Sequence, residues 1–230
     1  MLCDHVAVTL VQSYCIELHA AASPEVDLWL GVYLAMRAVG RVTLPLFCFV
    51  LVEGFVHTRS RRKYALRLLL FALVSQLPFD YMLRLDFSYA RYLNIMFTLL
   101  LSFCALWLGE SAGTRLGLPR WGTMALVGAV VFGAGMLADV LSMGYGSYCV
   151  YIIGALYLAR GHRLAQFALG CALTVLTCRF DWGDVQMWAV VGFALIALYN
   201  GERGRGMKWF FYLFYPVHML VLGLLDHWLF

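Results

Sequence analysis

The sequence has few charged residues and no long polar stretch. Charged residues make up 13% of its 230 residues, whereas a typical soluble domain carries roughly 25%. So small a set cannot cover a water-facing surface, and the mean hydropathy is +0.80. No polar stretch approaches the roughly 50 residues that a soluble domain needs. These absences predict that most of the surface faces lipid.

Cysteine pairs of the kind that hold metals or disulfides are also missing. The seven cysteines include no C-x-x-C pair and lie mainly in apolar segments, where cysteine is a small packing residue. We expect no metal ion. The first twenty residues lack Lys and Arg and contain Asp4, Glu17 and His19, which argues against a cleaved signal peptide.

The sequence instead contains continuous apolar runs of about 15 to 25 residues, the length of membrane-spanning helices. A membrane β-barrel would show shorter segments of alternating polarity. We therefore predict an all-α, polytopic helical membrane protein with about nine transmembrane helices (8–10), forming a single domain over residues 1–230. The expected spans are Leu2–Ala20, Leu28–His57, Tyr64–Leu83, Tyr92–Glu110, Trp121–Leu137, Tyr148–Ala159, Leu164–Cys178, Val185–Tyr199 and Trp209–Trp228.

Basic residues are divided unequally between the two sets of alternating loops. The set that begins with Ser60–Lys63 holds twelve basic residues, and the other set holds three. Loops rich in Lys and Arg stay in the cytoplasm. The bias predicts a multi-pass protein of the cell membrane with its N-terminus inside and its C-terminus outside. The net charge of +4 then reflects topology, and we expect no nucleic-acid partner.

The second span contains charged residues that are costly to place in a membrane and therefore mark a candidate site. Arg37 and Arg41 are four residues apart and share a helix face. Pro45 removes an amide and frees the carbonyl of Arg41, which predicts a kink there. Glu53 and His57 are also four apart; they belong either to a polar site or to an ion pair that anchors the helix end.

Two other histidines are candidates. His218 lies near the middle of the last span, two residues after Pro216. It is either functional or a neutral ring bonded to a carbonyl at the kink. Asp4 and His5 open the first span, at its expected cytoplasmic end. Adjacent residues do not share a helix face, so Asp4 need not orient His5.

Polar residues near the expected outer loops form a weaker group of candidates. The segment ADVLSMGYGSY is a glycine-containing turn whose tyrosines also fit an aromatic belt at the membrane surface. Residues of these loops that would converge on a substrate are Asp80, Asn94, Asp139, Tyr145 and Gln186.

Much of the chain resembles a known family. The segments RVTLPLFCFVLVEGFVHTRSRRKYALRLLLFALVSQLPFDYML, LNIMFTLLLSFCALWLGE, LIALYNGERG and FFYLFYPVHMLVL resemble the TraX family, and MLCDHVAV resembles its first helix with an Asp-His pair. The founding member is associated with N-terminal acetylation of a conjugative pilin. The family is grouped with wider transmembrane acyltransferases. FCFVLVEGF is similar to their F-x-x-x-S-G-F pattern, with Glu53 in place of serine, and His5 matches their catalytic histidine.

This resemblance implies an acetyltransferase that uses cytoplasmic acetyl-CoA. His5 would act as general base or carry the acetyl group covalently. The acceptor would be an amine or hydroxyl of a pilin N-terminus, a glycan or a lipid. The other expected catalytic residues are Asp4, Glu53 and His218. The expected acceptor-binding residues are Arg37, Arg41, His57 and the outer-loop group. The CoA phosphates would bind Arg59, Arg61, Arg62 and Lys63, helped by Arg160 and Arg163.

Two other hypotheses stay open. One is a small transporter or permease with a proton or substrate path through Arg41, Glu53 and His218; the lack of an internal repeat argues against it. The other is a non-catalytic membrane subunit of a conjugation or surface-assembly machine, for which none of these polar residues would be needed.

Overall fold

The computed structural model describes residues 1–83, 92–181, 183–202 and 208–230. Within these ranges the chain is helical, and its β-structure is a single isolated bridge between Leu93 and Met143. The helices are α1 Leu2–Val6, η1 Ala7–Val11, α2 Gln12–Ala20, α3 Val26–Arg41, α4 Thr43–His57, α5 Arg61–Met82, α6 Ile95–Arg115, α7 Arg120–Val140, α8 Gly146–Leu158, α9 Arg163–Thr177, η2 Val185–Trp188, α10 Ala189–Ala197 and α11 Lys208–Leu229.

These helices coincide with the expected spans. Four helical segments are long and apolar enough to cross a membrane: Val26–His57, Arg61–Met82, Ile95–Arg115 and Arg120–Val140. Shorter apolar helices cover Gly146–Leu158, Arg163–Thr177 and Val185–Ala197. The prediction of an all-α, multi-pass membrane protein is confirmed.

Short polar residues and glycine begin and end several helices. Ser60 and Asn94 precede α5 and α6, and their side-chain oxygens accept hydrogen bonds from the amides of Lys63 and Met96, which would otherwise lack partners. Gly117 follows α6 with φ of +64°, a left-handed conformation that ends helices because glycine has no Cβ. The α4–α5 and α6–α7 connections are short, covering residues 58–60 and 116–119.

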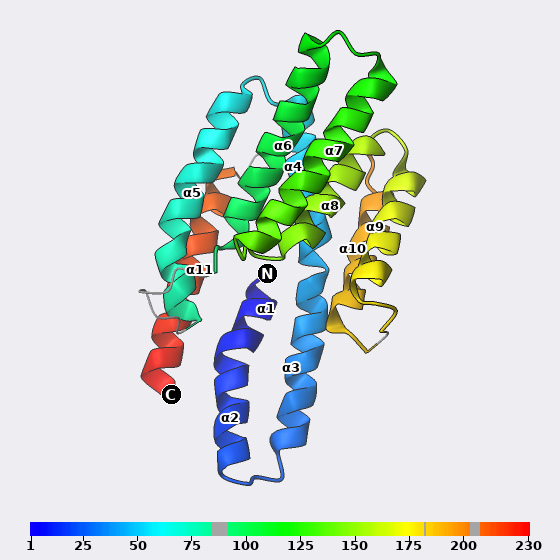
Figure 1. Ribbon diagram of the computed structural model, residues 1–230. Coiled ribbons are helices and arrows are strands. Elements are labelled where there is room, and N and C mark those ends of the chain that lie inside the picture. The colour runs from blue at the N-terminus through cyan, green and yellow to red at the C-terminus, as the bar shows by residue number, and fades with distance from the viewer. Residues whose placement is uncertain (84–91, 182, 203–207) are drawn as a thin grey trace.

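The bundle is organised around α8 and α6. Helix α8 packs against α4, α6, α7 and α9, while α6 also packs against α5 and α7. Helix α11 lies along α5 on one side, and α9 with α10 forms the other side (Figure 1). Large buried side chains fill the centre: Phe55, Phe103, Leu106, Ile152, Ile153, Tyr157 and Phe193.

Helices α3 and α4 form one long element with a break at Val42. The break lies where Pro45 predicted it. Gly192 of α10 packs against the break, since a Cβ there would lie 2.6 Å from the Val42 carbonyl oxygen. The 32-residue element is about 48 Å long, and a bilayer core is about 30 Å thick. Its α3 end projects from the bundle together with α2, as a hairpin (Figure 1).

The first helical segment starts inside the molecule. Figure 1 shows the N-terminus beside the junction of α3 and α4, from which α1, η1 and α2 run to the tip of the hairpin. Gly40 permits this contact, because a Cβ there would lie 2.3 Å from the Cβ of Asp4. The expectation that Asp4 and His5 lie at the same end as the basic loops is wrong. Their place is the level of Arg41.

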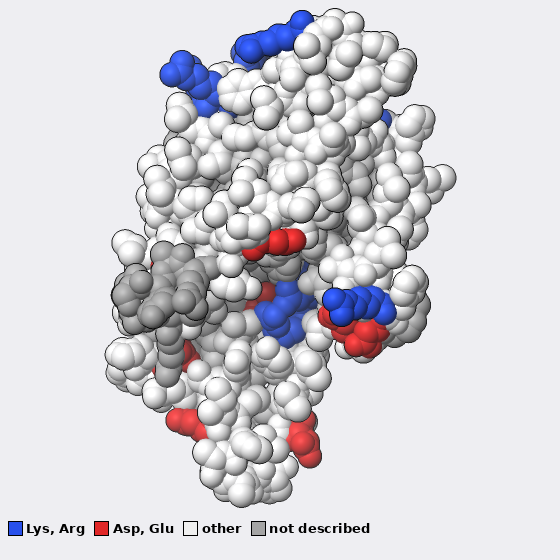
Figure 2. All heavy atoms as spheres, viewed as in Figure 1, with Lys and Arg blue, Asp and Glu red and all other residues white. Residues whose placement is uncertain are grey.

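Charges are separated along the bundle. On the face that Figure 2 shows, Lys and Arg gather at the end where the α4–α5 and α6–α7 connections lie, and the acidic side chains lie in the other half beside a smaller group of basic ones. Glu53 and Glu110 lie at the basic end. This distribution has the pattern expected from the loop bias. The side of the membrane that each end faces stays a prediction.

Candidate functional site

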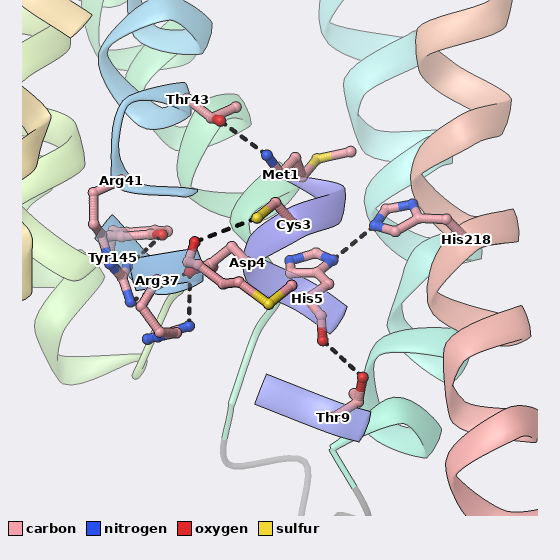
Figure 3. Close-up of polar contacts among 11 residues, drawn as sticks. Met1, Cys3, Asp4, His5, Thr9, Arg37, Arg41, Thr43, Tyr145 and His218 are labelled. Atoms are coloured by element: carbon pink, nitrogen blue, oxygen red, sulfur yellow. Dashed lines mark hydrogen bonds and ion pairs between the residues drawn. The ribbon is translucent and has the colours of Figure 1, made fainter. Parts of the chain in front are cut away.

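A pair of histidines joins the first helix to the last. Nδ1 of His5 lies 2.7 Å from Nε2 of His218 (Figure 3). Nδ1 of His218 lies 2.5 Å from the carbonyl oxygen of Phe214. A carbonyl only accepts, so His218 Nδ1 is the donor and neutral His218 has a lone pair on Nε2. His5 then donates through Nδ1. The lone pair of His5 is then on Nε2, so this nitrogen is able to accept a proton.

The backbone after His5 is unusual. Residues Ala7–Val11 form a π-helical turn, a wide turn that recurs at functional sites. The hydroxyl of Thr9 donates to the His5 carbonyl at 2.7 Å. This local bond adds to the histidine pair in fixing the backbone of the first helix.

Asp4 points away from His5, toward α3. Its Oδ1 lies 2.9 Å from Nη1 of Arg37 and 3.8 Å from Nη2 of Arg41. Nη1 of Arg41 donates to the hydroxyl of Tyr145 at 2.7 Å. Asp4 therefore does not orient His5, as the adjacency of the two residues predicted. It joins α1 to the two arginines, and Figure 3 shows this group and His218 on opposite sides of His5.

Tyr145 occupies this site in a strained backbone conformation. Its φ is +62°, which is rare for a non-glycine residue and costs of order 1–3 kcal/mol. The loop before it is tied to the start of α6: the Gly144 amide donates to the Leu93 carbonyl at 2.8 Å, and the Thr98 hydroxyl donates to the Gly144 carbonyl at 2.8 Å. These bonds hold the Tyr145 hydroxyl toward Arg41.

A cavity of about 530 Å³ extends from these residues into the bundle, within the size range of small-molecule sites. Asp4, His5 and Tyr145 line one end, and Tyr64 and Tyr212 line the part nearer the starts of α5 and α11. The wall between is mostly apolar: Leu44, Leu46, Phe47, Val50, Leu51, Leu68, Phe71, Ile95, Met96 and Leu99. Along α4 it runs from the level of Gly40 to Leu51, about 16 Å at the helical rise.

Glu53 and His57 lie apart from this group. His57 is 73% exposed by side chain at the end of α4; its Nδ1 donates to the Glu53 carbonyl at 2.9 Å and lies 3.7 Å from Glu53 Oε2. Glu53 is twelve residues beyond Arg41, about 18 Å along the helix. Their catalytic and substrate-binding roles stay untested, and their geometry is that of the helix-end pair considered from the sequence.

The basic block lies at the same end as Glu53. Arg59, Arg62 and Lys63 are exposed. Arg61 contacts Glu110 at 2.5 Å and lies over the Phe55 ring, and Tyr157 donates to the other oxygen of Glu110. Arg160 and Arg163 lie over the rings of Tyr157 and Phe49. Exposed cations therefore remain available at this end for a ligand.

Most of the outer-loop candidates make hydrogen bonds with nearby helices and loops and lie apart from the histidine pair. Gln76 donates to Asp80 at 2.8 Å and accepts from Asn94, whose amide also donates to the Ala72 carbonyl. Asp139 accepts from the Ser147 amide at the start of α8. Gln186 donates to Tyr148 at 3.4 Å. Of this group, the structure brings only Tyr145 to the histidines and arginines. A substrate-binding role for the others stays a prediction.

Sequence reasoning missed three contributors. The Phe214 carbonyl sets the tautomer of His218, and the Tyr215 ring lies 6.3 Å from that of His5. Both belong to the FYPVH segment around Pro216. Their closeness in sequence to the candidate His218 could have indicated that they contribute to the site. Glu110 was treated only as a span end. A carboxylate facing the basic loop could have indicated its pairing with Arg61.

Comparison with known proteins identifies the family. A model of the TraX protein family matches residues 1–226. The chain belongs to the TraX family. It is also 33% identical over 216 residues to a protein of Dichelobacter nodosus described as probable fimbrial assembly protein FimC, serogroup H1; the match covers 83% of this chain and 82% of the relative. No solved structure matches the chain.

Proposed function

We propose that this TraX-family protein is an integral membrane acetyltransferase that moves acetyl from acetyl-CoA to an amine or hydroxyl acceptor. The observation that carries the proposal is the His5–His218 pair at one end of the cavity. The description of FimC as a fimbrial assembly protein supports an acceptor on a pilus subunit or another cell-surface molecule.

The free Nε2 of His5 supplies the chemistry. It accepts the proton of the acceptor as the acceptor nitrogen or oxygen attacks the thioester carbonyl carbon. Collapse of the tetrahedral intermediate breaks the carbon–sulfur bond, and the leaving thiolate takes the proton from the His5 imidazolium. Throughout these steps His218 Nε2 accepts a hydrogen bond from His5 Nδ1–H, which keeps the His5 ring in position.

The donor would enter from the basic end. Tyr64, which lines the cavity, lies one helical turn after Arg61, and exposed Arg59, Arg62 and Lys63 suit the CoA phosphates. The acyl-bearing arm would then follow the apolar wall along α4 to His5. Exclusion of water by this wall would protect the thioester from hydrolysis. With the basic loops in the cytoplasm, the acetyl group would be delivered near the opposite membrane surface.

A transporter has less support. A path through Arg41, Glu53 and His218 needs polar groups between them, and the residues of α4 that line the cavity beyond Arg41 are apolar apart from Thr43. A non-catalytic assembly subunit would leave the histidine pair without a role.

The test is transfer of radiolabelled acetyl from acetyl-CoA. Purified protein is incubated with membranes from cells that lack it, and label in protein, glycan and lipid fractions is counted. We expect His5→Ala to abolish the transfer. The matched control is His19→Ala, an exposed histidine in the last turn of α2, which should transfer like wild type. Unchanged transfer by His5→Ala would overturn the role of His5.

A further inference from the structure

The arginines of α3 form a site with surplus positive charge. Arg37 and Arg41 share Asp4, which is the one acidic side chain within 4 Å of either arginine among the described residues. The side-chain charges of the group therefore sum to +1. The side chains of Arg41 and Arg37 are only 11% and 20% exposed. A charge so far removed from water is costly unless another charge balances it.

The contacts within the group do not use all the arginine donors. A guanidinium has five N–H donors in a planar fork. Arg41 gives one to the Tyr145 hydroxyl. Arg37 lies 2.9 Å from Asp4 Oδ1, yet this buried oxygen has no partner with hydrogen-bond alignment. The Asp4 carboxylate thus balances the charge of one arginine, but it does not satisfy all the N–H donors of either guanidinium.

The arginines can be reached from outside the bundle. Figure 2 shows basic atoms in a hollow where the α2–α3 hairpin meets the bundle, at the level of α3 that carries its two arginines. On the other side of Asp4 lies the apolar cavity, which Asp4 and His5 both line. The His5 ring lies between His218 and the Asp4–arginine group (Figure 3). A ligand held by the arginines would therefore have its neighbouring atoms beside His5.

We propose that Arg37 and Arg41 bind an anionic oxygen group, a carboxylate or a phosphate, of a ligand that enters through this hollow. The planar fork of arginine matches both groups, and one such anion brings the side-chain charge of the site to zero or below. The inference rests on the proposed function in one respect: the ligand that carries the anion is the acyl acceptor, held with its amine or hydroxyl toward His5.

The test measures anion binding without acyl transfer. The full chain is purified in a detergent free of phosphate, and its melting temperature is followed with sodium phosphate and, separately, sodium acetate, at an ionic strength kept constant with chloride. A bound anion stabilises the folded protein by mass action. We expect at least one of the two anions to raise the melting temperature of wild type, and the Arg37→Gln variant to bind it at least about tenfold more weakly.

Three further variants separate binding from damage. Arg120→Gln removes an exposed arginine at the start of α7 and should bind like wild type. Asp4→Asn removes the competing carboxylate, so anion binding should become tighter, a change that misfolding would not produce. His5→Ala should retain anion binding although it loses transfer. Failure of the acetyltransferase proposal would thus leave this binding result intact.

No stabilisation of wild type by either anion, an equal response of Arg37→Gln and wild type, or weaker or unchanged binding by Asp4→Asn would each overturn the proposal. If Arg37→Gln does not fold, the Asp4→Asn result decides alone. Mass spectrometry of the purified protein distinguishes the sources of the anion: phospholipid bound to wild type and lost in Arg37→Gln identifies a lipid headgroup, and acetate binding without bound lipid identifies an acceptor carboxylate.

Discussion

When two neutral imidazoles are hydrogen-bonded, fixing the donor at one ring fixes the donor and acceptor nitrogens of both. The carbonyl oxygen of Phe214 fixes them here, because it can only accept a hydrogen bond from His218 Nδ1. His218 is thereby a positioning residue: it holds the His5 ring through Nδ1 and leaves Nε2 free. Loss of this contact would let the His5 ring rotate and exchange its tautomer.

We predict that His218→Ala lowers kcat by roughly 10²-fold, the low end of the range for general acid–base catalysis, and leaves KM for acetyl-CoA nearly unchanged. The reason is that His5 remains but is misoriented for part of the time. Steady-state kinetics of acetyl transfer measures both constants. A rise in KM with constant kcat would contradict this role and assign His218 to binding.

At the residue scale, the sequence identified most of the site. Arg37, Arg41 and His218 are candidates because charged and titratable groups are costly in a membrane. Asp4 and His5 are candidates because they resemble the Asp-His pair of the family's first helix, and the structure brings all five together with Tyr145. Glu53 and His57 are candidates because of the same cost in a membrane, but they lie near the other end of α4. Spacing along a helix gives relative depth, but it does not show which helices face one another.

At the element scale, the first helix is positioned by one glycine. Gly40 lies where α1 crosses α3, and the missing side chain leaves room for Asp4 to reach Arg37. The position of the break at Val42 could be predicted, because Pro45 removes a specific hydrogen bond. The starting depth of α1 could not, since it depends on packing between residues far apart in the sequence.

We predict opposite effects for two alanine substitutions on α3. Gly40→Ala places a Cβ against Asp4 and should destabilise the protein by about 1–3 kcal/mol, as overpacking does. Gly31→Ala has no atom within 4 Å of the new Cβ and should stabilise it by about 0.5–1 kcal/mol, because glycine is costly inside a helix. Thermal unfolding in detergent gives both signs. Equal stabilisation by the two variants would exclude the close approach of α1.

At the scale of the whole molecule, the arrangement of charge predicts orientation. The length of the apolar runs predicts the spans, and the basic residues of alternate loops predict the orientation in the membrane. Both features are averages over many residues, so they can be recognised without a structure. The projection of the α2–α3 hairpin was not readable in this way, because it depends on how α1 and α3 pack against the rest of the bundle.

We predict opposite exposure of two engineered thiols in intact cells. In a chain whose seven cysteines have been replaced, Glu25→Cys at the hairpin should react with a membrane-impermeant maleimide added outside. Arg59→Cys, in the α4–α5 connection, should react only after the membrane is opened. Both positions are exposed, so accessibility within the protein does not differ. Labelling of Arg59→Cys alone in intact cells would reverse the orientation.

The apolar wall of the cavity also has an electrical consequence. Ions and protons cross a pore through water or through a chain of polar groups, and apolar constrictions expel water. The wall formed by Leu44, Phe47, Leu51, Leu68 and Leu99 offers them neither. We therefore expect the cavity to extend from the histidine pair toward the basic end without conducting ions, so that the voltage across the surrounding membrane would be maintained.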